Sequence, residues 1–350
     1  MSLPTVEQLI ADPIARYPRA TVACFDPTSG GLPRRTLDRE RLIVFLERLA
    51  AAGAPAVLIA ASTGHGHLRT VDELAEWFVA AAKVNMPSCL KTALLRPEDG
   101  EEANARLVDV LAKHDYRVVY VRPGTNLPKG ATDDEVAANM QPLLAQIASA
   151  GLAVGLYSIP DVSGVAMSAE AAGKLVAGPQ GERIVAIKVT EADYDCSTRT
   201  FLEHPRLSRL KIVQGWDPHL ARALKEGGQR MGVTSGPMSF AVFQYLHLLD
   251  AAERGDWTEV AAAQEAVSIL FRAMQDDPTK FADLQRAKYI MGLGEPLTAE
   301  VKLEQVERVM SALESLPRSD DRHRLAKSLD LLSDGPMHAS LMKLVDEASL

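Results

Sequence analysis

The chain has few cysteines and no excess of basic residues. Its three cysteines, Cys24, Cys89 and Cys196, are scattered and show no C-x-x-C spacing. Neither a disulfide framework nor a zinc knuckle is therefore expected. The formal net charge of −8 argues against nucleic acid or an anionic membrane as a partner, because both attract basic patches.

Long apolar runs and an export signal are also missing. No stretch approaches the ~18 uninterrupted apolar residues that a membrane-spanning helix requires. Residues 1–10 lack a basic segment followed by an apolar one, so we expect no export signal. Unpaired cysteines suit a reducing compartment, and we therefore expect a cytoplasmic protein that acts on small molecules.

The remaining composition is that of an ordinary globular protein. Apolar residues make up 47% and charged residues 24% of the 350 residues, so a large core is expected. A chain of this length is longer than one typical domain, but an α/β barrel of about 250 residues folds as one unit. One barrel with an appended segment fits this length.

From residue 20 onwards, short apolar runs alternate with polar loops and amphipathic helical stretches, which is typical of βα units. Eight strands are predicted, at 20–25, 56–61, 88–94, 117–121, 153–157, 184–188, 211–214 and 231–234. The helices that follow them are predicted at 37–52, 71–83, 101–113, 133–150, 168–176, 198–203, 218–225 and 240–254. Eight units favour an α/β fold of the (β/α)8 barrel type over an open doubly wound sheet, which usually has five or six strands.

Beyond residue 255 the strand signals stop. Five consecutive helices are predicted, at 257–274, 280–291, 299–313, 320–332 and 336–347, with prolines between them. We therefore expect an N-terminal segment at 1–19, a barrel at 20–254 and a C-terminal helical domain at 255–350.

Two candidate catalytic residues end neighbouring strands. Tyr157 ends the fifth predicted strand and Lys188 ends the sixth, and the active sites of such barrels lie at these strand ends. A buried lysine that loses its proton can form a Schiff base with a ketone, and a nearby phenol can transfer protons. Alternatively, Lys188 extends out of the barrel mouth or pairs with Glu191, and Tyr157 is a core ring.

A turn rich in small residues follows the second strand. Ser62, Thr63 and Gly64 offer two hydroxyls and adjacent backbone N–H groups, which together could hold a carboxylate. Alternatively, this turn is an ordinary loop of small residues.

Four short segments together resemble the dihydrodipicolinate synthase and N-acetylneuraminate lyase superfamily. They are A-S-T-G-H at 61–65, R-P-G-T-N-L-P at 122–128, Y-S-I-P at 157–160 and I-K at 187–188. The resemblance extends from about residue 20 to about residue 295. It implies a class I aldolase-type lyase that acts on pyruvate or another 2-oxo acid, without a cofactor or metal, as a homotetramer or homodimer.

The same resemblance implies roles for individual residues. Lys188 would be the Schiff-base nucleophile and Tyr157 the proton-transfer residue, while Ser62 and Thr63 would hold the carboxylate of the 2-oxo acid. Thr125 stands where the synthase has a relay tyrosine, and Val162 stands where it has a carboxylate-binding arginine. Both differences count against dihydrodipicolinate synthase activity, because an apolar side chain cannot replace a bidentate cation.

Three further residues are candidate substrate contacts. His65 replaces the glutamate of the family motif, and with His67 it could instead contribute to a metal site, although no third ligand is evident. Arg122, at the end of the fourth strand, could bind a distal acid group or form a salt bridge at the barrel rim. Thr234 ends the eighth strand, at the start of a loop that could choose the substrate.

The leading hypothesis is aldolase-type carbon–carbon cleavage or condensation through an imine on Lys188. A dehydratase acting on a 2-oxo sugar acid would use the same imine, and dihydrodipicolinate synthase is the third choice. A catalytically silent homologue that binds a small acid or a partner is the alternative from another class.

Overall fold

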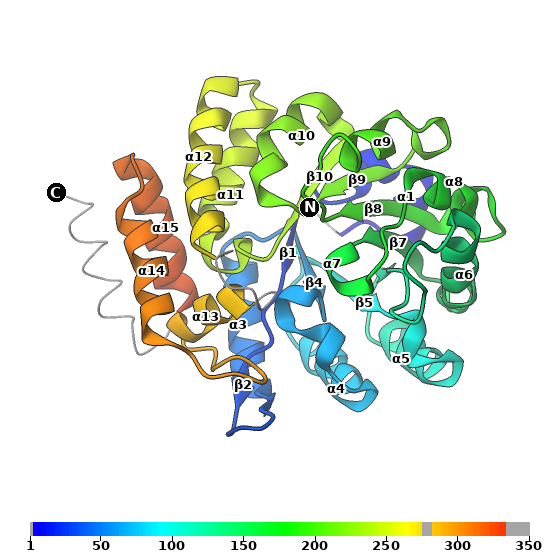
Figure 1. Cartoon of the computed structure of the whole chain (residues 1–350), viewed down its shortest axis with the longest axis horizontal. Coiled ribbons are helices and arrows are strands. Elements are labelled where there is room, and N and C mark those ends of the chain that lie inside the picture. The colour runs from blue at the N-terminus through cyan, green and yellow to red at the C-terminus, as the bar shows by residue number, and fades with distance from the viewer. Residues whose placement is uncertain (1–2, 275–281, 334–350) are drawn as a thin grey trace.

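Eight parallel strands close into a barrel in a computed structural model that describes residues 3–274 and 282–333 (Figure 1). The strands are β1 (Ala20–Ala23), β4 (Ala56–Ile59), β5 (Leu90–Leu95), β6 (Val118–Val121), β7 (Ala153–Ser158), β8 (Ile184–Val189), β9 (Lys211–Gln214) and β10 (Met231–Ser235). Strand β1 pairs with both β4 and β10, which closes the ring. The predicted (β/α)8 barrel followed by C-terminal helices is confirmed.

Helices follow the strands and form an outer layer around the barrel. They are α3 (Arg39–Ala51), α4 (Val71–Ala82), α5 (Glu101–Lys113), α6 (Asp133–Ser149), α8 (Ala169–Ala177), α9 (Thr198–Glu203), α10 (Leu220–Gly227) and α11 (Met238–Glu253). Capping boxes begin two of them, because the Thr70 and Thr132 hydroxyls accept the backbone N–H groups of Glu73 and Glu135. The predicted ranges differ from these bounds by a few residues at most.

Two hydrophobic cores hold the barrel together. One fills the space between the strands and the outer helices, and the other lies inside the barrel. The N-terminal helices α1 (Val6–Ala11) and α2 (Pro13–Arg16) extend the inner core, since Leu9 and Tyr17 belong to it. The Tyr17 and Tyr120 hydroxyls share a hydrogen bond of 2.5 Å. The end of the barrel where the strands begin is therefore closed by protein.

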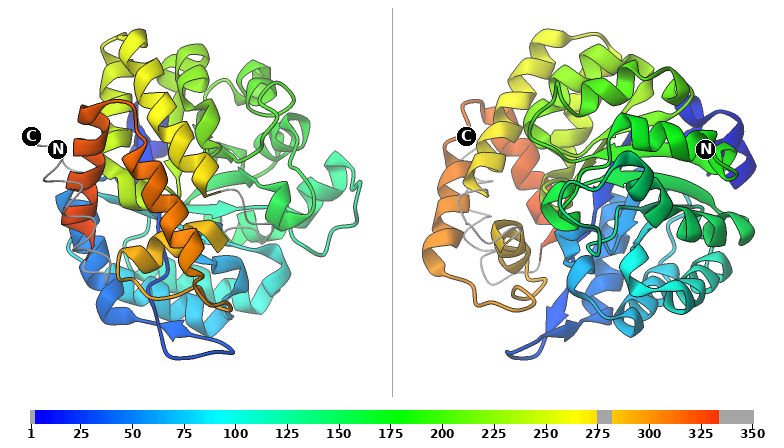
Figure 2. Two further views of the ribbon diagram at one scale, coloured as in Figure 1. Left: turned by 60° about the vertical axis from the view of Figure 1, so that its left-hand side comes forward. Right: turned by 45° about the vertical axis from the view of Figure 1, so that its right-hand side comes forward.

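The C-terminal helices form a layer at one side of the barrel (Figures 1 and 2). They are α12 (Trp257–Ala273), α13 (Ala282–Ile290), α14 (Leu303–Glu314) and α15 (Ser319–Leu332). Helix α11 packs against both α12 and α15, so the division of the chain at residue 254 stays a prediction. The helix predicted at 336–347 lies outside the described residues. No helix in the described ranges could span a membrane.

Several short elements escaped prediction. Strands β2 (Thr28–Ser29) and β3 (Thr36–Leu37) form a small antiparallel pair, and α7 (Pro160–Ser163) follows β7. The 3-10 turns are η1 (Ser62–Gly64), η2 (Gly66–Leu68), η3 (Pro97–Asp99), η4 (Gly181–Arg183), η5 (Pro205–Leu207), η6 (Asp217–His219) and η7 (Gly228–Arg230). Elements of two to four residues are too short to show a hydrophobic period.

Candidate active site

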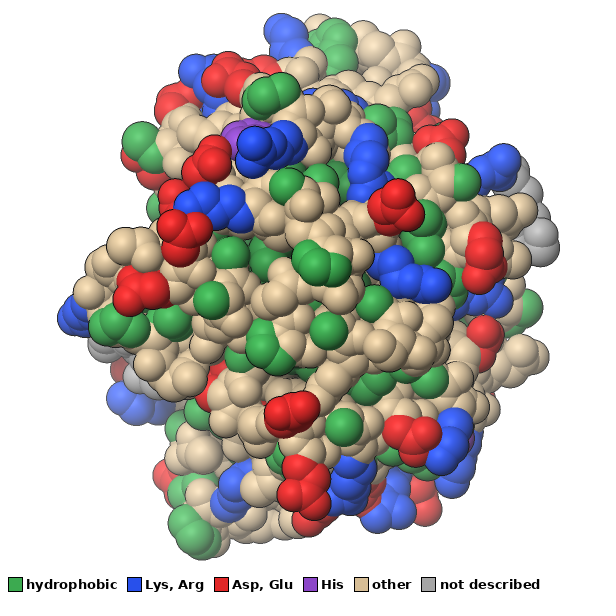
Figure 3. Space-filling model, turned by 90° about the vertical axis from the view of Figure 1, so that its right-hand side faces the viewer, with side chains coloured by type: hydrophobic (Ala, Val, Ile, Leu, Met, Phe, Trp, Pro, Cys, Tyr) green, Lys and Arg blue, Asp and Glu red, His purple; other side chains and the backbone are tan. Residues whose placement is uncertain are grey.

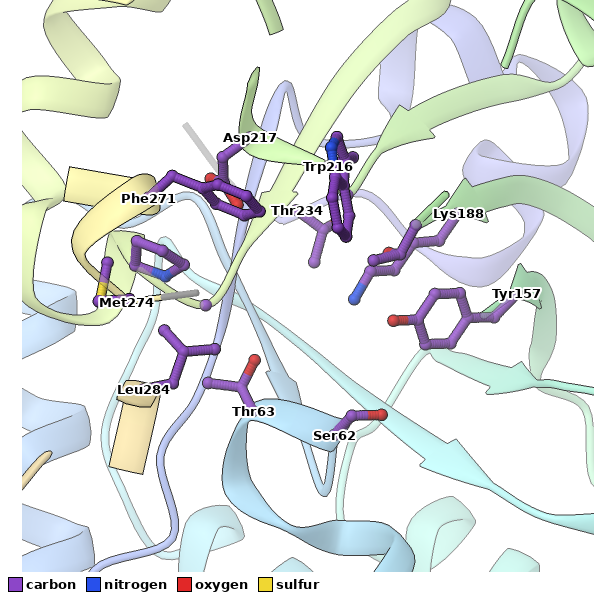
Figure 4. A pocket seen from close by; sticks show the side chains of 14 residues that line it. Ser62, Thr63, Tyr157, Lys188, Trp216, Asp217, Thr234, Phe271, Met274 and Leu284 are labelled. Carbon is purple, nitrogen blue, oxygen red and sulfur yellow. The ribbon is translucent and has the colours of Figure 1, made fainter. Parts of the chain in front are cut away.

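Tyr157 and Lys188 lie side by side at the C-terminal end of the barrel. Strands β7 and β8 pair with Tyr157 opposite Lys188, so both side chains leave the sheet on the same face. Both are buried, with exposures of 1% and 3%, and the Lys188 Nζ lies 4.2 Å from the centre of the Tyr157 ring. Figure 4 shows the amine and the phenol hydroxyl pointing into one pocket.

The environment of Lys188 favours a neutral amine. Burial lowers the pKa of Lys188 to about 7, and the neighbouring Asp217 carboxylate opposes this shift. A substantial fraction of the amine is therefore unprotonated near neutral pH, as attack on a carbonyl carbon requires. Glu191, the alternative partner of Lys188, instead accepts a hydrogen bond of 2.5 Å from Ser158 Oγ.

Tyr157 keeps its phenolic proton. Burial raises the pKa of Tyr157 well above its usual value, while the nearby Thr190, Arg122 and Ser62 side chains oppose this shift. Neither the Thr190 hydroxyl nor the Ser62 hydroxyl meets the distance and angle of an ordinary hydrogen bond to the phenol. A protonated phenol beside a neutral amine can donate to a carbonyl or hydroxyl oxygen of a bound molecule.

Unused hydroxyl groups surround this pair. Ser62 Oγ, Thr190 Oγ1 and Thr234 Oγ1 are buried and have no hydrogen-bond partner in the described part of the chain. All three residues line the pocket, as Thr63 does. Since buried polar atoms usually find partners, these hydroxyls suit a polar ligand. The backbone N–H groups of Gly64 and His65 are already used, because they donate to carbonyls within the turn.

Asp217 is a buried acid in the pocket that the sequence analysis missed. It begins η6 after β9, and its Oδ1 accepts hydrogen bonds of 2.5 Å from both Ser235 Oγ and Tyr245 Oη. Burial raises the pKa of Asp217 to about 6, and these hydrogen bonds and Lys188 oppose the shift. The rule that located Lys188, that active-site residues lie at the strand ends or in the loops that follow, would also have located Asp217.

Apolar side chains form the other side of the pocket. Trp216 comes from the loop after β9, Phe271 and Met274 from the end of α12, and Leu284 from α13. Hydrophobic periodicity in the sequence predicted these helices, but it did not indicate which face of each helix packs against the barrel. No signal in the sequence therefore assigned these residues to the pocket.

His65 and Arg122 do not line this pocket. Arg122 is fully buried and forms an ion pair with Glu98, with one nitrogen–oxygen distance of 3.3 Å, and it also donates to the Pro123 carbonyl at 2.7 Å. This arrangement matches the salt bridge considered as the alternative for Arg122.

His65 is 6% exposed, and its ring centre lies 5.8 Å from that of His67. Burial lowers the pKa of His65 to about 4, with smaller contributions from Lys288 and Arg69, so its ring is neutral at pH 7.

The two residues that differ from the synthase pattern also lie away from the pocket lining. Thr125 is exposed in the loop after β6, and Val162 is half-buried in α7. Within the described residues, no cluster of three His, Cys, Asp or Glu side chains could hold a metal ion.

A (β/α)8 barrel with a buried lysine beside a tyrosine at its C-terminal end defines the class of this protein. Residues 136–315 match the Dihydrodipicolinate synthetase family, and the chain belongs to this family. Membership implies Schiff-base lyase or aldolase chemistry on 2-oxo acids. No curated protein sequence matches the chain significantly.

Several solved structures share the fold. A Sulfolobus solfataricus 2-keto-3-deoxygluconate aldolase variant is 16% identical, with a TM-score of 0.71, and the match covers 85% of this chain and 95% of that one. Dihydrodipicolinate synthase from Cyanidioschyzon merolae is 19% identical, with a TM-score of 0.71 and coverages of 85% and 97%. A Ruminococcus gnavus sialic acid aldolase variant is 15% identical, with a TM-score of 0.70 and coverages of 85% and 97%.

Proposed function

We propose that this protein is a lysine-dependent lyase that cleaves or forms a carbon–carbon bond next to a 2-oxo acid. The observation that carries the proposal is the pairing of Tyr157 with Lys188 on adjacent strands, with both side chains buried in one pocket. The similar structures include a 2-keto-3-deoxygluconate aldolase and a sialic acid aldolase, which supports aldolase chemistry here.

The chemistry begins at Lys188. Its neutral amine attacks the ketone carbon of the 2-oxo acid, and loss of water leaves a protonated imine. Ser62 and Thr63 bind the carboxylate, with Thr234 as a further hydroxyl contact. Tyr157 first donates its phenolic proton to the departing water, and the phenolate that remains accepts the proton of the substrate's 4-hydroxyl group as the carbon–carbon bond breaks. The bonding electrons move into the imine to form an enamine. Protonation of the enamine and hydrolysis release pyruvate and restore the amine.

Three features favour aldolase activity over dihydrodipicolinate synthase activity. Thr125 is exposed and has no phenol, Val162 has no charge, and Arg122 already pairs with Glu98. The described residues of the pocket lining therefore lack the cation that the synthase uses for its second carboxylate. A dehydratase would use the same imine, and the products distinguish it from an aldolase.

Borohydride trapping tests the proposal. In the presence of pyruvate, reduction should add one pyruvate-derived group to the protein, and peptide mass mapping should locate this group on Lys188. The Lys188→Met variant should show no adduct. Tyr157→Phe should still trap some imine but lose ~10²-fold or more in turnover, because the proton-transfer group is gone.

Two other lysines on strands provide internal controls. Lys91 donates to the Ala82 and Val84 carbonyls, and Lys211 donates to the Ile14 and Gln229 carbonyls. Neither lines the pocket, so neither should carry an adduct. An adduct on Lys91 or Lys211 in place of Lys188, or no adduct with pyruvate or other 2-oxo acids, would contradict the proposed function.

A further inference from the structure

The pocket has two chemically different halves. Hydroxyl groups surround the Lys188 amine on one side, while Phe271, Met274 and Leu284 lie on the opposite side (Figure 4). Among the described residues that line the pocket, Lys188 and Asp217 are the only ones that can carry a full charge near neutral pH. The described side chains of Phe271, Met274 and Leu284, on the side away from the lysine, are therefore all apolar.

Trp216 and Phe271 form an aromatic pair in this apolar half. Their ring centres are 5.0 Å apart at an interplanar angle of 66°, a favourable edge-to-face arrangement. Trp216 belongs to the loop after β9, whereas Phe271 belongs to α12. The pair therefore joins the barrel to the C-terminal helices at the pocket.

Helix α13 holds the opposite wall close to the carboxylate-binding turn. Gln285 Nε2 donates to the Thr63 carbonyl at 2.5 Å, and Leu284 is 7% exposed beside it. A methyl group added to Gly236 would lie 2.6 Å from Thr63 Oγ1 and 3.3 Å from Leu284 Cδ1. This close packing leaves little freedom for the wall to rearrange around a larger polar ligand.

A polyhydroxylated or carboxylated substrate tail would bind poorly against these apolar side chains. Each hydroxyl placed against Phe271 or Met274 would lose water without gaining a hydrogen bond. The Asp217 carboxylate would repel a carboxylated tail, and its Oδ1 already accepts from Ser235 and Tyr245. An aromatic or branched apolar tail would instead replace water against the ring pair and the aliphatic side chains.

We propose that the second substrate of this enzyme is an aldehyde with an apolar, aromatic side group, selected by Trp216, Phe271, Met274 and Leu284. This proposal rests on the proposed function. In the synthetic direction, the enamine carbon of pyruvate bonds to the aldehyde carbon, and the aldehyde oxygen takes the proton of Tyr157. Hydrolysis of the imine then releases a 4-hydroxy-2-oxo acid with the aromatic group on carbon 4.

The test compares three aldehydes with pyruvate as the common partner: benzaldehyde, glyceraldehyde and succinic semialdehyde. We expect kcat/KM for benzaldehyde to exceed those for the other two by ~10²-fold, the size expected when a pocket offers a polar group no partner. Phe271→Ala should raise KM for benzaldehyde on the order of tenfold and still give a borohydride adduct on Lys188. Trp257→Ala, at the exposed start of α12 outside the pocket, is the matched control and should keep the wild-type KM.

The outcomes separate the two proposals. An adduct on Lys188 together with faster turnover of glyceraldehyde or succinic semialdehyde would overturn the apolar-aldehyde proposal and leave the lyase proposal standing. An adduct with no consumption of any aldehyde would overturn it in the same way. Failure of pyruvate to form an adduct at all would overturn the proposed function and this proposal with it.

Discussion

Asp217 influences the charge of Lys188 without forming an ion pair with it. The carboxylate raises the pKa of Lys188, partly offsetting the effect of burial that lowers it to about 7. Ser235 and Tyr245 hold this carboxylate in place by hydrogen bonds of 2.5 Å. At the scale of single residues, we therefore expect Asp217 to act as a positioning residue that sets how much neutral amine is present at a given pH.

The pH dependence of imine trapping tests this role. Below its pKa, Lys188 is an ammonium ion and cannot attack, so the trapping rate with pyruvate should rise with pH, with a midpoint near pH 7. Asp217→Asn removes the negative charge that stabilises the ammonium ion. The pKa of Lys188 should then fall, and the midpoint should move to lower pH.

Asp193→Asn is the matched control for this prediction. Asp193 is an exposed acid in the loop after β8, and asparagine keeps the oxygen that accepts the Cys196 backbone N–H. The control should leave the midpoint in place. A midpoint that stays near pH 7 or rises in Asp217→Asn would contradict the assigned role.

The loop between β9 and α10 brings Asp217 and Trp216 against the end of β8. Its first residue is Gly215, whose backbone N–H donates to the Val189 carbonyl at 2.7 Å. A β-carbon at Gly215 would lie 2.1 Å from Thr190 Oγ1 and 3.1 Å from Lys188 Cε. At the scale of elements, this glycine therefore permits the close approach of loop and strand that forms the pocket.

Gly215→Ala should displace Thr190 and Lys188. Because small misplacements of a reacting group are costly, we expect the rate of pyruvate trapping to fall on the order of 10²-fold. Gly31→Ala is the control, since a methyl group there meets nothing within 4 Å. Adding Thr190→Ala to Gly215→Ala should recover part of the rate by removing the clashing oxygen. Normal trapping by Gly215→Ala would show that the loop tolerates the extra carbon.

A buried charge cluster joins the C-terminal helices to the barrel. Lys288 on α13 donates to the Asp26 carbonyl at 2.9 Å and to its Oδ1 at 3.2 Å, and Arg69 donates to Asp26 Oδ2 at 2.6 Å. All three side chains are fully buried. Charged groups of both signs are interspersed on the molecular face in Figure 3, where water screens them, but this cluster lies beneath the surface.

At the scale of the whole molecule, Lys288→Met should loosen the attachment of α13. Removing one partner of a buried ion pair typically costs about 3–5 kcal/mol, and the lower end applies here because Arg69 still pairs with Asp26. Urea denaturation should report this loss as a lower midpoint. Lys302→Met, at an exposed position before α14, should change the free energy of unfolding by less than ~0.5 kcal/mol. Equal midpoints for the two variants would contradict a stabilising role for the cluster.

The sequence by itself determined the barrel and the central pair of its candidate site. Alternating apolar runs and helical stretches encode βα units locally, and the carboxyl ends of parallel strands must meet at one edge of a barrel. The positions of Tyr157 and Lys188 at the ends of consecutive predicted strands were therefore enough to bring them together. The adjacent hydroxyls of Ser62, Thr63 and Thr234 followed from the same rule.

Only the tertiary structure decided which side chains complete the pocket. Phe271, Met274 and Leu284 follow Lys188 by many residues, and they reach the pocket because α12 packs against η6 and α13 packs against η1. The burial of Arg122 against Glu98, which removes it from the pocket, likewise depends on contacts between separate loops. Periodicity reports which face of a helix is apolar, but the partner of that face depends on shape and charge complementarity between segments distant in sequence.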